Sequence, residues 1–340
     1  MIYCVIVTYG QRRDLLLATL RAALASGVDR SVVVDNGAHW AVSEELQNTF
    51  PQRVDVICLL KNRGSAPGFR AGIARAMELG ADHLLILDDD LAIEAATLHQ
   101  LQQSLEDLAK TRGLPKSAVC AYRNSTMERM IKIEGKNLAH SVAPPILRFG
   151  GSLLLKSLRS VISGEWQDDF AARGPAPSHH GTVAIPFAPY GGLFMHRSAV
   201  NLIGLPDERF GLYWDDIEWT YRITSNGGII VIDCDAPLNE LEISLPFRSK
   251  HVSRFHSLLL RDAGPSDYRI YYEIRNAIYF SSHSAQSQIP LLRTRIFFFR
   301  MGILITALIL RRTHRGRTIC KAVSDGLSGA LGYNAEFPFE

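Results

Sequence analysis

The sequence has few cysteines, and their spacing suits neither a metal site nor a disulfide framework. The five cysteines of the 340-residue chain are far apart and form no Cys-X-X-Cys pair. This spacing excludes a cysteine-based zinc site and a small disulfide-stapled domain. An odd number of dispersed thiols is typical of a protein in a reducing compartment.

The sequence also lacks a hydrophobic run of the length that a membrane-spanning helix needs. The longest such run, residues 296–310, has 15 residues and is interrupted by Arg300, whereas a spanning helix needs about 20 apolar residues. At the start of the chain, an apolar run follows Met1 without a basic region before it, which argues against a signal peptide. We therefore expect a cytoplasmic protein.

Positive and negative charges nearly balance over the chain, but basic residues are concentrated in one segment. The formal net charge is only +3, which disfavours a dedicated nucleic-acid-binding protein. Residues 293–321, in contrast, contain several arginines and no acidic residue. This segment can lie peripherally on the inner face of the cytoplasmic membrane, with its basic side chains against anionic headgroups. It can equally form a buried helix on the catalytic domain or a dimer contact.

The first third of the sequence alternates apolar runs with helical patterns, and hydrophobic residues make up 47% of the chain. The expected strands are Ile2–Val7, Ser31–Val34, Val54–Leu59 and His83–Leu87. This alternation predicts an α/β fold with a mostly parallel central sheet flanked by helices. Ligands of such sheets bind at the carboxyl ends of the strands. The polar residues at or after these ends are Thr8, Asp35, Asn62 and Asp88.

The rest of the chain is less regular. A strand is expected within Pro186–Met195, which contains Tyr190-Gly191-Gly192, and another at Ile229–Asp233. From Tyr268 to about residue 332 the pattern is helical, apolar and basic.

Three adjacent carboxylates, Asp88-Asp89-Asp90, follow the fourth strand. They repel one another unless a cation or hydrogen-bond donors compensate their charge. In an extended segment Asp88 and Asp90 point to the same side, and their hard oxygen ligands suit Mg²⁺ or Mn²⁺ together with phosphate oxygens. The alternative is an acidic cap at the start of the next helix.

Two further segments have both a functional and a structural interpretation. Asp35-Asn36-Gly37 can bind a nucleobase or ribose, and it is also an ordinary turn sequence. Residues 62–68 (NRGSAPG) precede a helix whose N-terminus favours phosphate. An ordinary strand-to-helix loop could have the same sequence.

A second acidic cluster, Trp214-Asp215-Asp216-Ile217-Glu218-Trp219, places carboxylates between aromatic residues. Aromatic rings can stack on sugars while a carboxylate deprotonates a hydroxyl group. A helix N-terminus capped by Asp explains the same residues, and both interpretations can hold together.

In order and spacing, the segments VTYG, VDNG, NRGSAPGFRAGI, LILDDD and WDDIEWTYR resemble those of family-2 glycosyltransferases with a GT-A fold. The NRGSAPGF loop, and a His followed by YYEIRN, are similar to the galactofuranosyltransferase and rhamnosyltransferase-like branch. The resemblance implies a catalytic domain over residues 1–282, with a nucleotide-binding half at about 1–120 and an acceptor half at about 183–282. A helical extension occupies residues 283–340.

The resemblance also implies roles for individual residues. The nucleotide-sugar site would contain Thr8, Asp35, Asn62, Gly64, Gly68, Asp88 and Asp89. The metal, Mn²⁺ or Mg²⁺, would be bound by Asp88, Asp90 and His256, with His256 preferred to His251 because of its distance to Arg275-Asn276. The catalytic base would be Asp216, and the acceptor site would contain Trp214, Asp215, Tyr190 and Gly191.

The implied reaction is inverting transfer of a sugar from a UDP- or dTDP-sugar to a glycan or lipid-linked glycan. Galactofuranose from UDP-galactofuranose is the first choice of sugar, and rhamnose from dTDP-rhamnose is the second. A sugar nucleotidyltransferase is a further alternative, but VTYGQRRDL has only one glycine where such an enzyme has a Gly-rich loop. A non-catalytic carbohydrate-binding protein would not need the acidic segments.

Overall fold

The computed structural model describes residues 1–123, 180–242, 258–259, 267–285 and 291–338. The chain divides into two compact units. The first comprises Met1–Gly135, Ala176–Ile243 and Phe339–Glu340, and the second comprises Lys136–Pro175 and Ser244–Pro338. The catalytic-domain boundary at residue 282 stays a prediction.

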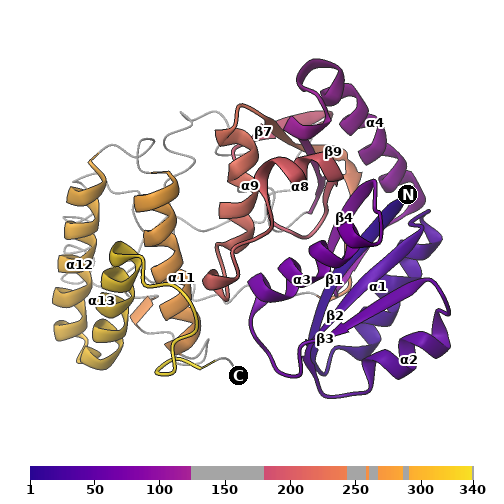
Figure 1. The fold of residues 1–340 in the computed structure, drawn as a ribbon. Coiled ribbons are helices and arrows are strands. Elements are labelled where there is room, and N and C mark those ends of the chain that lie inside the picture. Colours follow the sequence, from indigo (N-terminus) through magenta and orange to yellow (C-terminus); the bar gives the residue numbers. More distant parts are fainter. Residues whose placement is uncertain (124–179, 243–257, 260–266, 286–290, 339–340) are drawn as a thin grey trace. The chain divides into compact units, whose positions relative to one another are not determined.

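The first unit is built on an eight-stranded sheet with the strand order β3-β2-β1-β4-β8-β6-β9-β7 (Figure 1). The strands are β1 Ile2–Gly10, β2 Arg30–Ala38, β3 Val54–Cys58, β4 His83–Asp88, β6 Ser117–Tyr122, β7 Thr182–Ile185, β8 Leu193–His196 and β9 Ile229–Pro237. Only β7 and β8 run antiparallel to their neighbours. The predicted mostly parallel sheet is thus confirmed. The short strands β5 (Leu91–Ala92) and β10 (Asn239–Glu240) pair separately.

Helices cover both faces of this sheet because its central strands are apolar on both sides. Side chains of β1 alternate between two cores, with Tyr3, Val5 and Val7 in one and Ile2, Cys4 and Ile6 in the other. The first core is closed by α3 (Ser65–Glu78), α8 (Arg197–Ile203) and α9 (Asp215–Ser225). The second is closed by α1 (Arg13–Ala25), α2 (Val42–Thr49) and α4 (Ala95–Arg112). Two 3-10 turns, η1 (Leu114–Lys116) and η3 (Glu208–Phe210), complete the unit.

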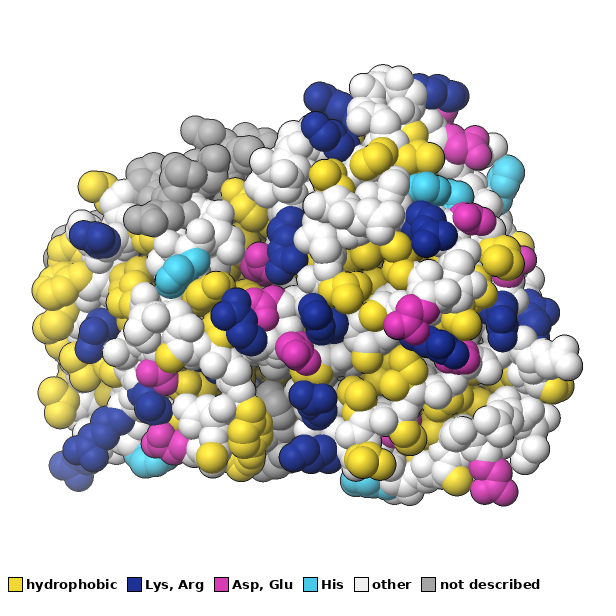
Figure 2. All heavy atoms as spheres, in the orientation of Figure 1, with side chains coloured by type: hydrophobic (Ala, Val, Ile, Leu, Met, Phe, Trp, Pro, Cys, Tyr) yellow, Lys and Arg dark blue, Asp and Glu magenta, His cyan; other side chains and the backbone are white. Residues whose placement is uncertain are grey.

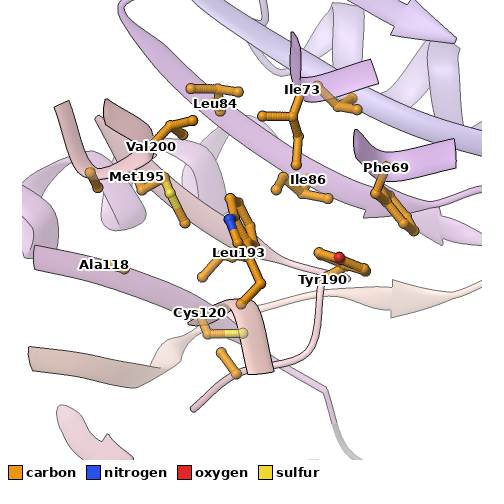
Figure 3. Packing of buried hydrophobic residues seen from close by; sticks show 14 of the residues in the cluster. Phe69, Ile73, Leu84, Ile86, Ala118, Cys120, Tyr190, Leu193, Met195 and Val200 are labelled. Carbon is orange, nitrogen blue, oxygen red and sulfur yellow. The ribbon is translucent and has the colours of Figure 1, made fainter. Parts of the chain in front are cut away.

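Figure 3 shows how the first core brings α3 onto the sheet: Phe69 and Ile73 lie over side chains of β4 and β8. Buried side chains of this kind each contribute about 1.5–3 kcal/mol relative to exposure. Rigid anchoring of α3 matters for function because its first turn borders the carboxyl ends of the strands.

The structure corrects the bounds of two expected strands. The second strand does not end at Val34 but continues to Ala38, and Asp35-Asn36-Gly37 forms an irregular end of β2. There the Asp35 carboxylate accepts hydrogen bonds from the N–H groups of Gly37 and Ala38 (3.1 and 2.8 Å), as in an Asx-turn, and Gly37 has a φ of +83°. Pro186–Met195 is not one strand: β7 ends at Ile185 and β8 begins at Leu193. Pro186 cannot donate to a ladder and Gly192 has a φ of +94°, so the segment between them forms a loop.

The second unit contains α11 (Asp267–Tyr279), the π-helical turn η4 (Phe280–Ser284), α12 (Leu292–Ile309) and α13 (Thr313–Ser328). Helix α13 packs on both α11 and α12. Gly326 allows the close contact with α11, because a Cβ there would meet the Arg275 carbonyl and the Ile278 side chain. Arg275 itself is buried, with its guanidinium 4.6 Å from the centre of the Tyr272 ring and donating to the Gly332 carbonyl at 2.6 Å.

Over the described part of the chain, every helix is too short or too polar to cross a membrane. The expected helical character from Tyr268 onward is confirmed for the described residues.

Candidate active site

The strand ends that carry polar residues lie side by side. Thr8 pairs with Asp35 across β1 and β2, and Val7 pairs with Asp88 across β1 and β4. The sheet therefore brings together three of the four predicted strand-end residues, as expected for neighbouring parallel strands.

The three consecutive aspartates point in two directions. Asp89 is buried and accepts a hydrogen bond from the Thr8 hydroxyl at 2.7 Å, whereas Asp88 and Asp90 stay partly exposed. These aspartates do not cap a helix, because α4 begins at Ala95 and its N-cap is Glu94. Asp88 ends β4, and Asp89 and Asp90 form the turn after it. This geometry leaves the first and third carboxylates available to a ligand, while the second is held inside.

Two arginines that the sequence analysis did not single out neutralise part of this charge. Arg12 donates to Asp89 at 2.7 Å and to Asp90 at 3.0 Å, and it also donates to Glu242 at 2.7 Å. Arg123 donates to Asp88 Oδ2 at 3.0 Å. These hydrogen bonds link the acidic residues to the segments that follow β1 and β6.

The arginines do not fully compensate the carboxylates. Burial raises the pKa of Asp88, and it raises the pKa of Asp89 to about 6 despite Arg12. Such shifts mean that the hydrogen bonds and ion pairs of Asp88 and Asp89 do not outweigh the cost of burying their charge. The site would therefore be stabilised by an additional cation.

The donor set suits a hard divalent metal ion. Asp88 and Asp90 each bond to an arginine through Oδ2 and have a second oxygen, Oδ1. Mg²⁺ is commonly held by one or two carboxylates plus substrate phosphates, so this pair fits. No cluster of three or more His, Cys, Asp or Glu side chains suited to a metal occurs among the described residues. His251 and His256 lie outside the described residues.

Gly191 is required for the contact between Asp88 and Arg123. A Cβ at residue 191 would lie 2.5 Å from both Arg123 Nη1 and Asp88 Oδ2. Real Cβ atoms do not approach other atoms so closely, so any side chain there must displace the pair. This glycine, predicted for the acceptor site, thus also borders the acidic cluster.

The loop between β3 and α3 is held by two asparagines. Asn62 Oδ1 accepts from the Gly64 N–H at 2.9 Å and from the Asn36 amide at 3.2 Å. Asn36 also donates to the Gly64 carbonyl at 3.0 Å and accepts from the Arg63 N–H at 2.9 Å. The sequence indicated only a turn at Asn36, whereas in the structure its side chain fixes the shape of the predicted donor loop.

The N-termini of α3 and α9 are joined. The Ser65 hydroxyl lies 3.1 Å from both Asp215 carboxylate oxygens, and the Ala66 N–H donates to the Gly211 carbonyl at 3.0 Å. Gly64 lies so close to the Gly211 carbonyl that a Cβ could not fit. The first turn of α9 already holds Asp215, Asp216 and Glu218, whereas that of α3 has no acidic residue. Because helix N-termini attract anions, the α3 end is the one that favours a phosphate group.

The residues before α9 have a strained backbone. Tyr213 and Trp214 both have a φ of +66°, in the left-handed region that bulky residues rarely adopt. Strain of this kind is of order 1–3 kcal/mol per residue and is concentrated at functional sites. It places Asp215 and Asp216 in the first turn of α9. WDDIEW thus contains a helix N-terminus, as the structural interpretation expected, but the N-cap residue is Trp214 and no Asp side chain caps the helix.

Asp215 and Asp216 have different surroundings. Asp215 is 2% exposed and bonded to Ser65, whereas Asp216 is only partly buried and accepts from the Ile217 N–H at 2.8 Å. Burial raises the pKa of both carboxyls, Asp216 raises that of Asp215 further, and the Asp88 charge contributes to the raised pKa of Asp216. Asp216 is therefore near the acidic cluster and is the more accessible member of the pair.

Two predicted site residues are packed into the core. Tyr190 is 4% exposed, and its ring lies 4.1 Å from Phe69 and 5.8 Å from Trp219, centre to centre (Figure 3). Gly68 is buried within α3, and a Cβ there would lie 2.8 Å from Val7. In the structure both residues support the position of α3, and their proposed ligand contacts stay predictions.

Residues 3–147 match the model of glycosyl transferase family 2. The chain is 25% identical over 229 residues to the galactofuranosyltransferase GlfT1 of Mycolicibacterium smegmatis, which covers 66% of each protein. It is 22% identical over 343 residues to the dTDP-rhamnosyl transferase RfbF of Shigella flexneri, covering 98% of this chain and 99% of that protein.

The fold is similar to that of GalNAc-T7 with UDP, GalNAc and Mn²⁺, with a TM-score of 0.52 and 11% identity. This match covers 83% of the present chain but only 47% of the other, and it bears on the fold alone. The central sheet, the family match and the relatives agree, and we conclude that residues 3–147 belong to a glycosyl transferase family 2 domain, that the fold is GT-A and that the chain is a glycosyltransferase.

Proposed function

We propose that this enzyme is a metal-dependent, inverting glycosyltransferase that takes a sugar from a UDP- or dTDP-sugar. The observation that carries this proposal is the grouping of outward-facing Asp88 and Asp90 with Asp216, whose raised pKa partly reflects the charge of Asp88. A metal-binding pair and a base are then close enough to act on the same donor.

The mechanism assigns separate tasks to these groups. Mn²⁺ or Mg²⁺ bound by Asp88 and Asp90 would neutralise the charge that develops on the diphosphate leaving group. Asp216 accepts the proton of the attacking acceptor hydroxyl, and its raised pKa makes it a stronger base than an exposed aspartate. A single displacement then inverts the anomeric centre without a covalent enzyme intermediate.

The chain's other residues position the donor. Asp35 is proposed to contact the nucleobase or ribose. Thr8, first expected to share this role, is fully buried, and its hydroxyl would instead hold Asp89 in place. The loop held by Asn36 and Asn62 would follow the diphosphate, near the Ser65 end of α3. Arg12 holds Asp89 and Asp90, and Arg123 holds Asp88, so both arginines orient the acidic residues.

The proposed sugar is galactofuranose from UDP-galactofuranose. It is supported by the NRGSAPGF loop and by the similarity to a galactofuranosyltransferase. Rhamnose from dTDP-rhamnose is the second candidate, supported by a relative of nearly the same length. We further propose a growing cell-surface glycan or lipid-linked acceptor. The enzyme would then act in the cytoplasm, in peripheral contact with the inner face of the membrane through residues 293–321.

The experiment is a screen of nucleotide-sugars, each measured for thermal stabilisation and hydrolysis with Mn²⁺ and with EDTA. We expect stabilisation by UDP-galactofuranose or dTDP-rhamnose only with the metal present, and at a donor concentration 100 times its Kd this amounts to about 2.7 kcal/mol. Pyrophosphate release from a nucleoside triphosphate and a sugar phosphate would instead identify a nucleotidyltransferase. Equal stabilisation in EDTA would refute the metal site.

A further inference from the structure

Helix α12 has an unusual surface: it is apolar on both sides. Its buried side packs within the second unit through Leu292, Ile296, Phe299, Ile303 and Ala307. Its other side is exposed, with Leu308 at 68% and Phe297 at 59%. We call this exposed set the α12 outer face, and it consists of Phe297, Phe298, Met301, Leu304, Ile305, Leu308 and Ile309.

The α12 outer face is a continuous stripe rather than scattered residues. At 3.6 residues per turn its members span an arc of about 140° along a helix of 18 residues. Seven of the sixteen exposed large hydrophobic side chains in the described part of the chain lie on this one helix. Contiguous apolar surfaces of this kind mark sites of interaction with a protein or a membrane. Figure 2 shows hydrophobic side chains gathered over α12.

The charges around the stripe identify the partner. By the same helical geometry, Arg293 and Arg300 lie along one edge of the α12 outer face. Exposed Arg311 and Arg312 follow its C-terminal end, and no acidic residue occurs from Arg293 to Lys321. A stripe of Phe and Leu bordered by arginines is complementary to a bilayer surface with anionic headgroups.

We propose that the α12 outer face lies in the interface of an anionic lipid bilayer, with the helix parallel to the membrane plane. The apolar side chains enter the boundary between headgroups and acyl chains, and the arginines contact lipid phosphates. This inference specifies the membrane contact of the proposed function, but it rests on exposure and charge and not on the identity of the transferred sugar.

The test is co-sedimentation of the full chain with vesicles of phosphatidylcholine alone or with added phosphatidylglycerol, at low and high salt. We expect binding to the anionic vesicles that weakens with salt. Leu308→Gln should reduce the apparent affinity roughly tenfold, since burying a leucine is equivalent to about that factor or more. Arg293→Gln should reduce it about fivefold, on anionic vesicles only.

The matched control is Leu327→Gln. Leu327 is an exposed leucine of α13 in the same unit, 40% exposed and outside the α12 outer face. The Leu327→Gln variant should bind vesicles as the wild type does. Leu308→Gln and Leu327→Gln should both keep the circular dichroism spectrum and melting temperature of the wild type.

Two results would overturn the proposal. One is equal vesicle binding by wild type and Leu308→Gln, or none by either. The other is a dimer in analytical ultracentrifugation without lipid that Leu308→Gln dissociates, which would assign the face to a second copy of the chain. The rate of transfer to a water-soluble acceptor should be the same in wild type and Leu308→Gln. This assay needs no membrane, so it tests the proposed reaction independently of vesicle binding.

Discussion

Replacing Asp216 with Asn is the most informative change in the candidate active site. The amide is nearly isosteric, and its oxygen can still accept the Ile217 N–H bond that Asp216 accepts at 2.8 Å. It cannot accept the proton of an acceptor hydroxyl. General-base catalysis contributes about 10²–10⁴ to a rate, so we expect kcat to fall by that factor, which corresponds to about 3–5 kcal/mol.

The same change should not destabilise the metal-free protein. Burial and the charge of Asp88 raise the pKa of Asp216, so its ionised form is disfavoured in the folded state. The resulting loss of stability is absent below the usual pKa of an aspartate and is complete above the raised value. Asp216→Asn should therefore increase stability at neutral pH by about 1–3 kcal/mol, at about 1.36 kcal/mol per pH unit.

Three measurements on Asp216→Asn test this reasoning. Transfer is followed with saturating donor and Mn²⁺, melting is measured without metal at acidic and neutral pH, and donor binding is measured by calorimetry. For the wild type, kcat/KM should rise with pH through the raised pKa of Asp216 and then level off. The variant should bind donor normally and lack this rise.

Asp215→Asn is the matched control. Asp215 is buried against the Ser65 hydroxyl, and an amide oxygen can still accept that bond, so we expect less than about a tenfold effect on kcat. A larger loss for Asp215→Asn than for Asp216→Asn would refute the assignment of the base.

Four further predictions concern the metal and the donor. EDTA should abolish transfer and Mn²⁺ or Mg²⁺ should restore it; full activity in EDTA would contradict the metal site. Asp90→Ala should lower the transfer rate by several orders of magnitude while the variant still melts as a folded protein. Gly191→Ala should cost about 1–3 kcal/mol of stability and weaken Mn²⁺ binding measured by calorimetry, because its Cβ would lie 2.5 Å from Asp88 Oδ2. Asn36→Ala should raise the KM for the donor about tenfold with a smaller effect on kcat, since three hydrogen bonds to the donor loop are lost; an unchanged KM would show that the loop does not need them. His256→Ala should weaken Mn²⁺ binding more than His251→Ala, and the reverse order in a titration would exchange their roles.

The sequence was sufficient for the first four strands of the sheet and for three of the four residues expected at their ends. Apolar runs identify strands, and parallel strands necessarily end at the same edge, so Thr8, Asp35 and Asp88 could be grouped without a structure. The inward position of Asp89 does not follow from strand alternation, because β4 ends at Asp88 and Asp89 and Asp90 form the turn after it. Asp89 is held inside by its hydrogen bonds from Thr8 and Arg12.

The arginines could not be assigned in the same way. Arg12 and Arg13 are adjacent, and only the folded loop determines that Arg12 meets Asp89 and Asp90 while Arg13 pairs with Glu45. Arg123 follows β6 directly, so the strand-end rule would have found it had that strand been recognised. Core packing of Tyr190 likewise depends on contacts between segments far apart in sequence.

The close packing of α13 on α11 has a consequence for the order in which the chain folds during synthesis. The Tyr271 hydroxyl donates to Asp325 at 2.6 Å, and the N–H of Asn334 donates to the Tyr272 hydroxyl at 2.9 Å. The buried side of α11 is therefore completed only by residues that lie 54 and 62 positions further along the chain. The described strands of the first unit end with β10 at Glu240. We therefore expect that unit to fold on the ribosome before α13 has been synthesised and can pack on α11. A premature stop before α13 would thus leave the apolar side of α11 exposed, and the shortened chain would be prone to aggregation and proteolysis even with its sheet intact.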